Sequence, residues 1–239
     1  MTTAVFIDGE AGTTGLQIRD RLEARDDIRL VSVPTEHRKD AAARKDAFAE
    51  ADVSILCLPD DAARDAVILA GGTRIIDAST AHRTAAAWVY GMPELPGQRD
   101  RIRDATRVAN VGCYATGSIA MLRPLTDAGL VPHDHGVVLT GVSGYTGGGK
   151  ALIAEYEAGT APDLYLYALT QSHKHIPEIM KYGGLTRKPL FQPMVANFAQ
   201  GMMVQLHLHA DLLPGEIAGH ARIEAALRDE GIMAEASDV

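Results

Sequence analysis

The stretch that decides the fold is Thr3–Gly15, which reads TAVFIDGEAGTTG. Its first part, Thr3–Asp8, has the apolar residues of a buried strand, and the G-x-x-G-x-x-G run Gly9–Gly15 is typical of a turn that opens a helix. Free backbone amides and the helix dipole at such a turn can hold a pyrophosphate. We therefore expect a dinucleotide to contact Gly9, Gly12, Thr13, Thr14 and Gly15. The first spacing departs from G-x-G-x-x-G, so an ordinary glycine-rich turn stays open as the alternative.

Short apolar segments alternate with helix-like segments after this turn. The further expected strands are Ile28–Val33, Val53–Leu58, Arg74–Ala78 and Arg107–Val111, and the expected helices are Gly15–Arg25, Ala41–Glu50 and Asp60–Ala70. Strands that alternate with helices form parallel βαβ units. The sequence therefore predicts an α/β, doubly wound nucleotide-binding domain over residues 1–113.

The pattern changes beyond Cys113 and predicts a second domain, residues 114–239. Its expected helices are Ala115–Ala128, Lys150–Ala158, Pro177–Tyr182 and Ile217–Arg228, and its expected strands are Gly136–Val142, Leu164–Thr170, Pro193–Ala196 and Met202–Ala210. The ending Glu230–Val239 reads as a polar tail. For this domain we expect an α+β architecture, as the family resemblance described below implies.

Composition narrows the class of function. The chain has 239 residues, 46% of them hydrophobic and 23% charged, as in folded globular proteins. Its 23 Lys and Arg against 31 Asp and Glu give a net charge of −8, which disfavours binding to nucleic acid or to an anionic membrane. Two cysteines make no disulfide framework, and no apolar run reaches the roughly 18 to 20 residues of a membrane span. We expect a cytoplasmic protein that acts on a small molecule.

The segment Pro34–Lys39, PTEHRK, bears on the choice of coenzyme. An NAD site places Asp or Glu at this point for the ribose. Here the Thr35 hydroxyl, followed by Arg38 and Lys39, suits a 2′-phosphate, so NADPH/NADP is the expected coenzyme. Glu36 could still serve NAD, and a solvated charged loop is the remaining alternative.

Cys113 lies in Asn110–Gly117, NVGCYATG, between an expected strand and an expected helix. A thiol at a helix N-terminus gains acidity from the helix dipole. Since Gly112 leaves room for a close approach, we expect Cys113 to be a nucleophile at the carboxyl edge of the sheet. Cys57 lies inside an apolar segment and is assigned to the core.

A proton-transfer partner is available in Gln171–Glu178, QSHKHIPE. Two histidines, His173 and His175, precede a carboxylate, Glu178, at the start of an expected helix. The residues alone leave open which histidine acts. The cluster lacks a nearby cysteine or a second histidine pair at helical spacing, so we expect no metal.

Several strings, taken in order, resemble the N-acetyl-gamma-glutamyl-phosphate reductase family in its short bacterial form: GEAGTTG, IIDASTAHR, YGMPEL, NVGCYATG, GVSGYTGGGK and HKHIPE. The resemblance runs from Met1 to about Arg228. It implies a Rossmann-like domain followed by a domain of the semialdehyde-dehydrogenase type, and NADPH-dependent reduction of an acyl phosphate to an aldehyde. It also implies a homo-oligomer, dimer or tetramer. Aspartate-semialdehyde dehydrogenase is a sister family.

The same resemblance implies residue roles. Cys113 matches the nucleophile, His173 the general acid/base and Glu178 its orienting carboxylate. The residues expected to bind the coenzyme include Pro59, Ser143, Gly144 and Gly147, and those expected to bind substrate are Ser79, Arg83 and Asn110. Taken by themselves, the glycine loop could instead be a hinge and Arg83 a surface residue.

Members of this family usually extend well beyond the position of Val239. We therefore expect an incomplete second domain of marginal stability, with uncovered strand edges. Two other functions stay open at this point. One is an inactive NADP-binding fragment, and the other is a sister enzyme that acts on aspartyl phosphate.

Overall fold

The computed structural model describes residues 2–213 and 219–229. The chain divides into two compact units. Unit 1 comprises Met1–Val111 with Gly149–Ala151, and unit 2 comprises Gly112–Gly148 with Leu152–Val239. Within the described residues no helix combines the length and the apolar character that crossing a bilayer requires.

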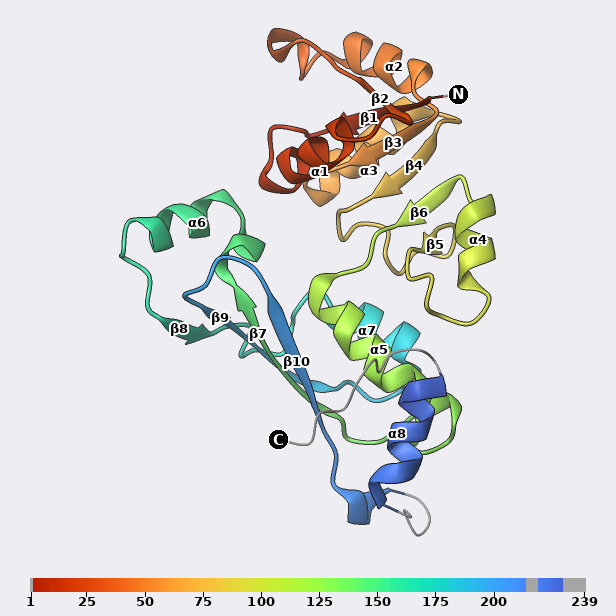
Figure 1. Ribbon diagram of the computed structural model, residues 1–239, viewed down its shortest axis with the longest axis vertical. Helices are drawn as coiled ribbons and strands as arrows, with labels where there is room; N and C mark the ends of the chain where they lie inside the picture. The colour runs from red at the N-terminus through yellow and green to blue at the C-terminus, as the bar shows by residue number, and fades with distance from the viewer. Residues whose placement is uncertain (1, 214–218, 230–239) are drawn as a thin grey trace. The chain divides into compact units, whose positions relative to one another are not determined.

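Unit 1 is built on a six-stranded sheet in the order β2-β1-β3-β4-β6-β5 (Figure 1). The strands are β1 (Thr3–Asp8), β2 (Ile28–Val31), β3 (Val53–Leu56), β4 (Arg74–Asp77), β5 (Val89–Tyr90) and β6 (Arg107–Ala109). All the pairings are parallel. The carboxyl ends of β1, β3, β4 and β6 therefore share one edge, where doubly wound sheets bind their ligands. The predicted doubly wound class is confirmed.

The helices of unit 1 are α1 (Thr13–Glu23), α2 (Ala41–Glu50), α3 (Asp60–Ala70) and α4 (Gln98–Asp104). The side chain of Asp40 caps α2 by accepting from the amide of Ala42, and Gly71 ends α3 at a φ of 57°. Phe6 and Phe48 meet edge to face, with ring centroids 5.1 Å apart, in a core with Leu56 and Ile75. The sequence prediction did not include β5 or α4, because both are too short to show a clear period.

Unit 2 contains a mixed four-stranded sheet in the order β10-β7-β9-β8. The strands are β7 (Val138–Gly144), β8 (Leu164–Leu166), β9 (Leu190–Ala196) and β10 (Met202–His207). β7 is parallel to β9, while β10 and β8 pair antiparallel at the two sides. The helices are α5 (Cys113–Asp127), α6 (Lys150–Glu157), α7 (Ile176–Gly183) and α8 (Gly219–Asp229), and α5 contacts α7, α8 and β10. The predicted α+β class is confirmed.

Several predicted boundaries in unit 2 were too long or shifted. The strand expected over Leu164–Thr170 ends at Leu166, and Ala168 and Gln171 then adopt positive φ values of 52° and 57°, which turn the chain. The strand expected to reach Ala210 ends at His207. The expected start of the last helix at Ile217 and the tail Glu230–Val239 lie outside the described residues.

One face of the unit 2 sheet exposes several large apolar side chains, together with polar residues such as Thr140 and Gln205. Leu139, Phe191 and Val195 are buried on the face that packs inward. Leu166 pairs with Met194, and Met203 pairs with Val142, on the opposite face. The exposed large apolar side chains of that opposite face are Leu164, Leu166, Leu190 and Met203. A patch of this kind marks an interaction surface.

Candidate functional site

The turn between β1 and α1 requires glycine for steric reasons. Gly9 has a φ of 91°, and a Cβ there would lie 2.4 Å from the carbonyl oxygen of Cys57. A Cβ at Gly15 would lie 2.5 Å from the carbonyl oxygen of Gly9. Gly12 is the N-cap of α1 and makes no side-chain cap hydrogen bond. The turn therefore packs tightly on β3 and presents the first-turn amides of α1, as a pyrophosphate site needs.

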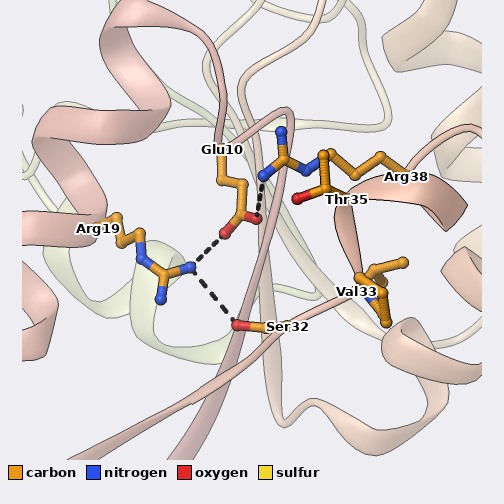
Figure 2. A pocket seen from close by; sticks show the side chains of 7 residues that line it. Glu10, Arg19, Ser32, Val33, Thr35 and Arg38 are labelled. Atoms are coloured by element: carbon orange, nitrogen blue, oxygen red, sulfur yellow. Dashed lines mark hydrogen bonds and ion pairs between the residues drawn. The ribbon is translucent and has the colours of Figure 1, made fainter.

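A hollow of about 490 Å³ lies beside this turn, lined by Glu10, Arg19, Ser32, Val33, Pro34, Thr35 and Arg38. Figure 2 shows the Glu10 carboxylate between two guanidinium groups. Its Oε2 is 2.6 Å from Nη1 of Arg19, and its Oε1 is 3.5 Å from Nη2 of Arg38. Nη1 of Arg19 also lies 3.5 Å from the hydroxyl of Ser32.

Two predicted coenzyme residues, Thr35 and Arg38, line this hollow. Lys39 and Glu36 are not among the described residues that line it. The sequence prediction missed Glu10, Arg19 and Ser32. Arg19 lies in the second turn of α1. Its helical spacing from the glycine turn is the sequence signal that could have identified it as a residue of this site.

The segment after β4 is held by a buried carboxylate. Asp77 is 0% exposed and accepts from the amide and the hydroxyl of Ser79, at 2.9 and 2.7 Å. Nδ1 of His82 lies 2.6 Å from the same carboxylate, and the His82 ring stacks on Trp88 at 4.1 Å. The hydroxyl of Thr80 donates to Asp60 at 2.5 Å. The sequence prediction missed Asp77 and His82, although an acid two residues before a serine is a signal for such a turn.

The three predicted substrate residues, Ser79, Arg83 and Asn110, meet where β4 and β6 end. The guanidinium of Arg83, 8% exposed, donates to the carbonyl of Asn110 at 3.0 Å and to that of Ala78 at 3.2 Å. The amide of Asn110 donates to the carbonyl of Asp77 at 2.7 Å. Arg83 is thus a buried residue that joins the two strand ends, rather than a surface arginine.

The two cysteines lie in different environments. Cys57 follows β3, and burial together with the charges of Asp77 and Asp8 raises the pKa of its thiol to about 11. Cys113 is exposed and is the first residue of α5, whose N-cap, Gly112, makes no side-chain cap hydrogen bond. Cys113 is therefore an accessible cysteine at a helix N-terminus, whereas Cys57 stays a neutral thiol.

Glu178 connects α7 to the start of α5. Its carboxylate is 1% exposed, and Oε2 accepts from the amide of Gly112 at 3.1 Å. Its Oε1 lies 3.9 Å from Nε2 of His175, which is also buried. This buried carboxyl group fixes the backbone that presents Cys113 and holds the loop before α7 in place.

His173 lies among aromatic rings in unit 2. Its ring centroid is 5.0 Å from that of Phe191, 5.6 Å from Tyr167 and 6.4 Å from Tyr114. Burial, with the positive charge of Lys174, lowers the pKa of His173 to about 4. Burial, with Tyr114 and Cys113 close by, raises the pKa of the Tyr167 phenol. His173 is therefore a neutral imidazole at neutral pH. It does not carry the positive charge of an imidazolium that would pair with a thiolate.

The tautomer of His173 follows from a backbone contact. The amide of His175 donates to Nδ1 of His173 at 3.1 Å, so Nδ1 carries no proton. In the neutral ring the proton must then be on Nε2. His173 can donate a hydrogen bond from Nε2 to a reacting oxygen.

The remaining predicted coenzyme residues have mixed surroundings. Pro59 is the N-cap of α3, at the carboxyl end of β3. A Cβ at Gly144 would lie 2.6 Å from the carbonyl oxygen of Ala199, so close packing of the end of β7 against the loop after β9 explains this glycine. A Cβ at Gly147 would meet nothing within 4 Å. Ser143 is buried in β7. Among the described residues, no three His, Cys, Asp or Glu side chains are placed to hold a metal ion.

Comparisons with known proteins match both units. The model of the semialdehyde dehydrogenase NAD binding domain matches residues 13–105, and that of the semialdehyde dehydrogenase dimerisation domain matches residues 113–230. The chain is 51% identical over 244 residues to N-acetyl-gamma-glutamyl-phosphate reductase of Chelativorans sp., covering 100% of this chain and 78% of that protein. It is 51% identical to the Brucella ovis protein of the same name, covering 96% and 76%.

Solved structures show the same fold at low identity. Aspartate semialdehyde dehydrogenase II from Vibrio cholerae superposes with a TM-score of 0.69 at 16% identity, over 96% of this chain and 79% of that one. Aspartate semialdehyde dehydrogenase with NADP from Candida albicans superposes with a TM-score of 0.67 at 16% identity, over 96% and 76%. These likenesses concern the fold alone.

Proposed function

Because this chain belongs to the N-acetyl-gamma-glutamyl-phosphate reductase family, as the sequence strings predicted, we propose that it reduces N-acetyl-L-glutamyl 5-phosphate with NADPH. The products are N-acetyl-L-glutamate 5-semialdehyde and phosphate, in the cytoplasmic pathway to arginine. The observation that carries the proposal is the exposed Cys113 at the start of α5, whose preceding amide is held by buried Glu178. That arrangement suits a nucleophilic cysteine.

Unit 1 fits the nicotinamide coenzyme. The glycine turn leaves the first-turn amides of α1 open to a pyrophosphate, and the hollow beside it offers Arg19 and Arg38 to a 2′-phosphate. Thr35 lines the same hollow, and Pro59 lies at the same sheet edge as the turn. When bound, the coenzyme supplies the hydride that reduces the acyl group.

Cys113 performs the covalent step. Its thiolate attacks the acyl carbon of the substrate, the carbon–sulfur bond forms, and the bond to the phosphate oxygen breaks, so that phosphate leaves and a thioester remains on the cysteine. With the hydride that a bound coenzyme would supply, the thioester on Cys113 would become a thiohemiacetal oxyanion. That oxyanion collapses to the aldehyde and returns the thiolate, whose charge the α5 N-terminus stabilises.

His173 stabilises the oxygen that becomes negative in both steps. Its Nε2–H donates to the carbonyl oxygen during thiolate attack and again after hydride addition. Nδ1 stays unprotonated in both steps, because it accepts a hydrogen bond from the amide of His175. Glu178 acts through the backbone, because it holds Gly112 and faces His175. It is a positioning residue.

One of the predicted substrate residues, Asn110, lies close to the nucleophile along the chain. Two residues separate Asn110 from Cys113 in sequence. Arg83 holds the Asn110 carbonyl, and Ser79 is fixed by Asp77, so the three predicted substrate residues present one preformed surface at the sheet edge. We assign to this surface the phosphate or the carboxylate of the substrate. In unit 2, Ser143, Gly144 and Gly147 are assigned to the coenzyme from the family resemblance.

A second copy of the chain is the partner. The match to a dimerisation domain and the exposed apolar face of the unit 2 sheet both support a homo-oligomer, in which that face is covered by the same face of the second copy. Neither the inactive fragment nor the aspartyl-phosphate enzyme has a comparable observation in its favour, since the aspartate semialdehyde dehydrogenases are only 16% identical.

The test is the reverse reaction. The 239-residue chain should reduce NADP when given N-acetylglutamate semialdehyde and phosphate, followed by the nicotinamide absorbance. Aspartate semialdehyde in place of the N-acetylated substrate distinguishes the sister activity. Faster turnover of aspartate semialdehyde would overturn the proposed substrate, and a chain that binds NADPH but turns over neither substrate would favour the inactive fragment.

A further inference from the structure

The hollow beside the glycine turn already contains an anion of its own. The Glu10 side chain is 16% exposed, and its two oxygens face two different guanidinium groups, those of Arg19 and Arg38 (Figure 2). Glu10 follows Gly9 directly, in the turn itself. A carboxylate thus occupies the centre of the cationic part of the hollow.

The groups around this carboxylate suit a phosphate better than a carboxylate. Two guanidinium groups converge from α1 and from the segment after β2, and the hydroxyl of Ser32 lies 3.5 Å from Arg19. Thr35 adds a second hydroxyl to the lining. Guanidinium groups bind the oxygens of phosphate bidentately, and hydroxyl groups fill its remaining acceptor sites.

We propose that Glu10 competes with the 2′-phosphate of NADP(H) for Arg19 and Arg38, and thereby sets how strongly this protein prefers NADPH over NADH. The inference rests on the proposed use of a nicotinamide coenzyme. It makes Arg19 a phosphate ligand and Glu10 a specificity-determining residue.

The competition follows from charge. A 2′-phosphate carries close to two negative charges at neutral pH, so it repels a carboxylate held a few ångströms away. Glu10 must turn out of the hollow when the phosphate enters, and its two ion pairs are then lost. Arg19 keeps a second partner, Glu23, whose Oε1 lies 2.8 Å from its Nη2, so the guanidinium stays in place when Glu10 leaves. NADH, with a hydroxyl at this position, needs no such exchange.

Calorimetric titration with two adenosine nucleotides tests the competition. Adenosine 2′,5′-bisphosphate and 5′-AMP differ only in the 2′-phosphate. Glu10→Gln should bind the bisphosphate about tenfold more tightly, since one like charge is removed, and should bind 5′-AMP within about twofold of the parent chain. An unchanged or weaker affinity for the bisphosphate, or an equal gain for both nucleotides, would overturn the role of Glu10.

A matched pair of controls comes from the same unit. Glu50 and Arg29 form an exposed ion pair at 2.6 Å that lies outside the hollow. Glu50→Gln should leave both affinities unchanged. A gain in Glu50→Gln as large as that in Glu10→Gln would mean that net charge, and not the hollow, sets the affinity.

Arg19→Met provides the second variant, with Arg29→Met as its control. Arg19→Met should weaken bisphosphate binding about tenfold and leave 5′-AMP binding within about twofold. If Arg19→Met binds the bisphosphate as tightly as the parent chain does, Arg19 is not a ligand of the 2′-phosphate. These titrations contain no acyl substrate, so they can fail while the reductase assay succeeds, and the reverse.

Discussion

The charged hollow of unit 1 and the histidine cluster of unit 2 have opposite physical environments. The hollow gathers full charges, with Glu10 between Arg19 and Arg38, in a partly exposed setting. The cluster surrounds His173 with aromatic rings and holds it neutral. Recognition of an anion needs charges that pair and exchange, whereas control of a reacting oxygen needs a fixed donor shielded from water. Changes in the hollow should therefore alter the choice of coenzyme, and changes around α5 should alter the rate.

The largest effect is expected from Cys113→Ser. Turnover should fall by at least about a thousandfold, because a serine hydroxyl is not ionised at neutral pH and no thioester forms. Coenzyme affinity should stay within about twofold, since the hollow lies in unit 1. Steady-state rates and NADPH fluorescence titration measure the two quantities, and loss of NADPH binding would make Cys113 a structural residue.

His173→Asn should lower kcat by about a hundredfold, the usual loss for one donor to a reacting oxygen. His175→Asn should lower it less, because His175 contributes its backbone amide to Nδ1 of His173 and that amide survives the substitution. The two variants are compared by kcat at saturating substrate. A larger loss in His175→Asn would transfer the donor role to His175.

Arg38→Glu should lower kcat/KM for NADPH relative to kcat/KM for NADH by about tenfold or more. The reason is that an acidic residue repels the 2′-phosphate of NADPH and accepts a hydrogen bond from the ribose hydroxyl of NADH. The kcat with saturating NADH should remain near that of the parent chain. Initial rates with both coenzymes give the ratio. An unchanged ratio would mean that Arg38 does not contact the 2′-phosphate.

The smallest expected effect is on how the free energy of unfolding depends on pH. The pKa of His173 is about 4 in the folded protein and about 6.5 when exposed, so the unfolded chain binds more protons between these values. The contribution of this residue to the free energy of unfolding is therefore present above about pH 6.5 and is lost as the pH falls toward 4. Urea denaturation at several pH values, compared with His173→Gln, measures it. If the free energy of unfolding changes with pH equally in the two proteins, His173 is not desolvated in the folded state.

Much of unit 1 could be predicted because its signals are local. The observed bounds of β1, α2 and α3 are the predicted ones. β1 is a continuous buried run that ends at the glycine turn, the Asp40 cap begins α2, and Pro59 and Gly71 flank α3. The strand β5, of two residues, gave no such signal. In unit 2 the strand predicted over Leu164–Thr170 extended too far, because the chain turns at Ala168 and Gln171 without glycine or proline.

The candidate site divides in the same way. Motif position predicted Thr35, Arg38 and Cys113, and the family resemblance predicted His173. Glu10, Asp77 and His82 were missed, since their roles depend on partners distant in the chain or hidden in a turn. The neutral state of His173 was also missed, because it results from rings contributed by α5, β9 and the segment after β8.

The sequence by itself determined the alternation of strands and helices and the glycine turn, because each depends on residues close together in the chain. It also determined the family, because several short strings occur in a fixed order. The tertiary structure alone decided which side chains face one another. It put the Glu10 carboxylate between two arginines, made Arg83 a buried link between two strand ends, and lowered the pKa of His173 to about 4. Charge pairing and desolvation depend on distance in space, which spacing along the chain does not specify.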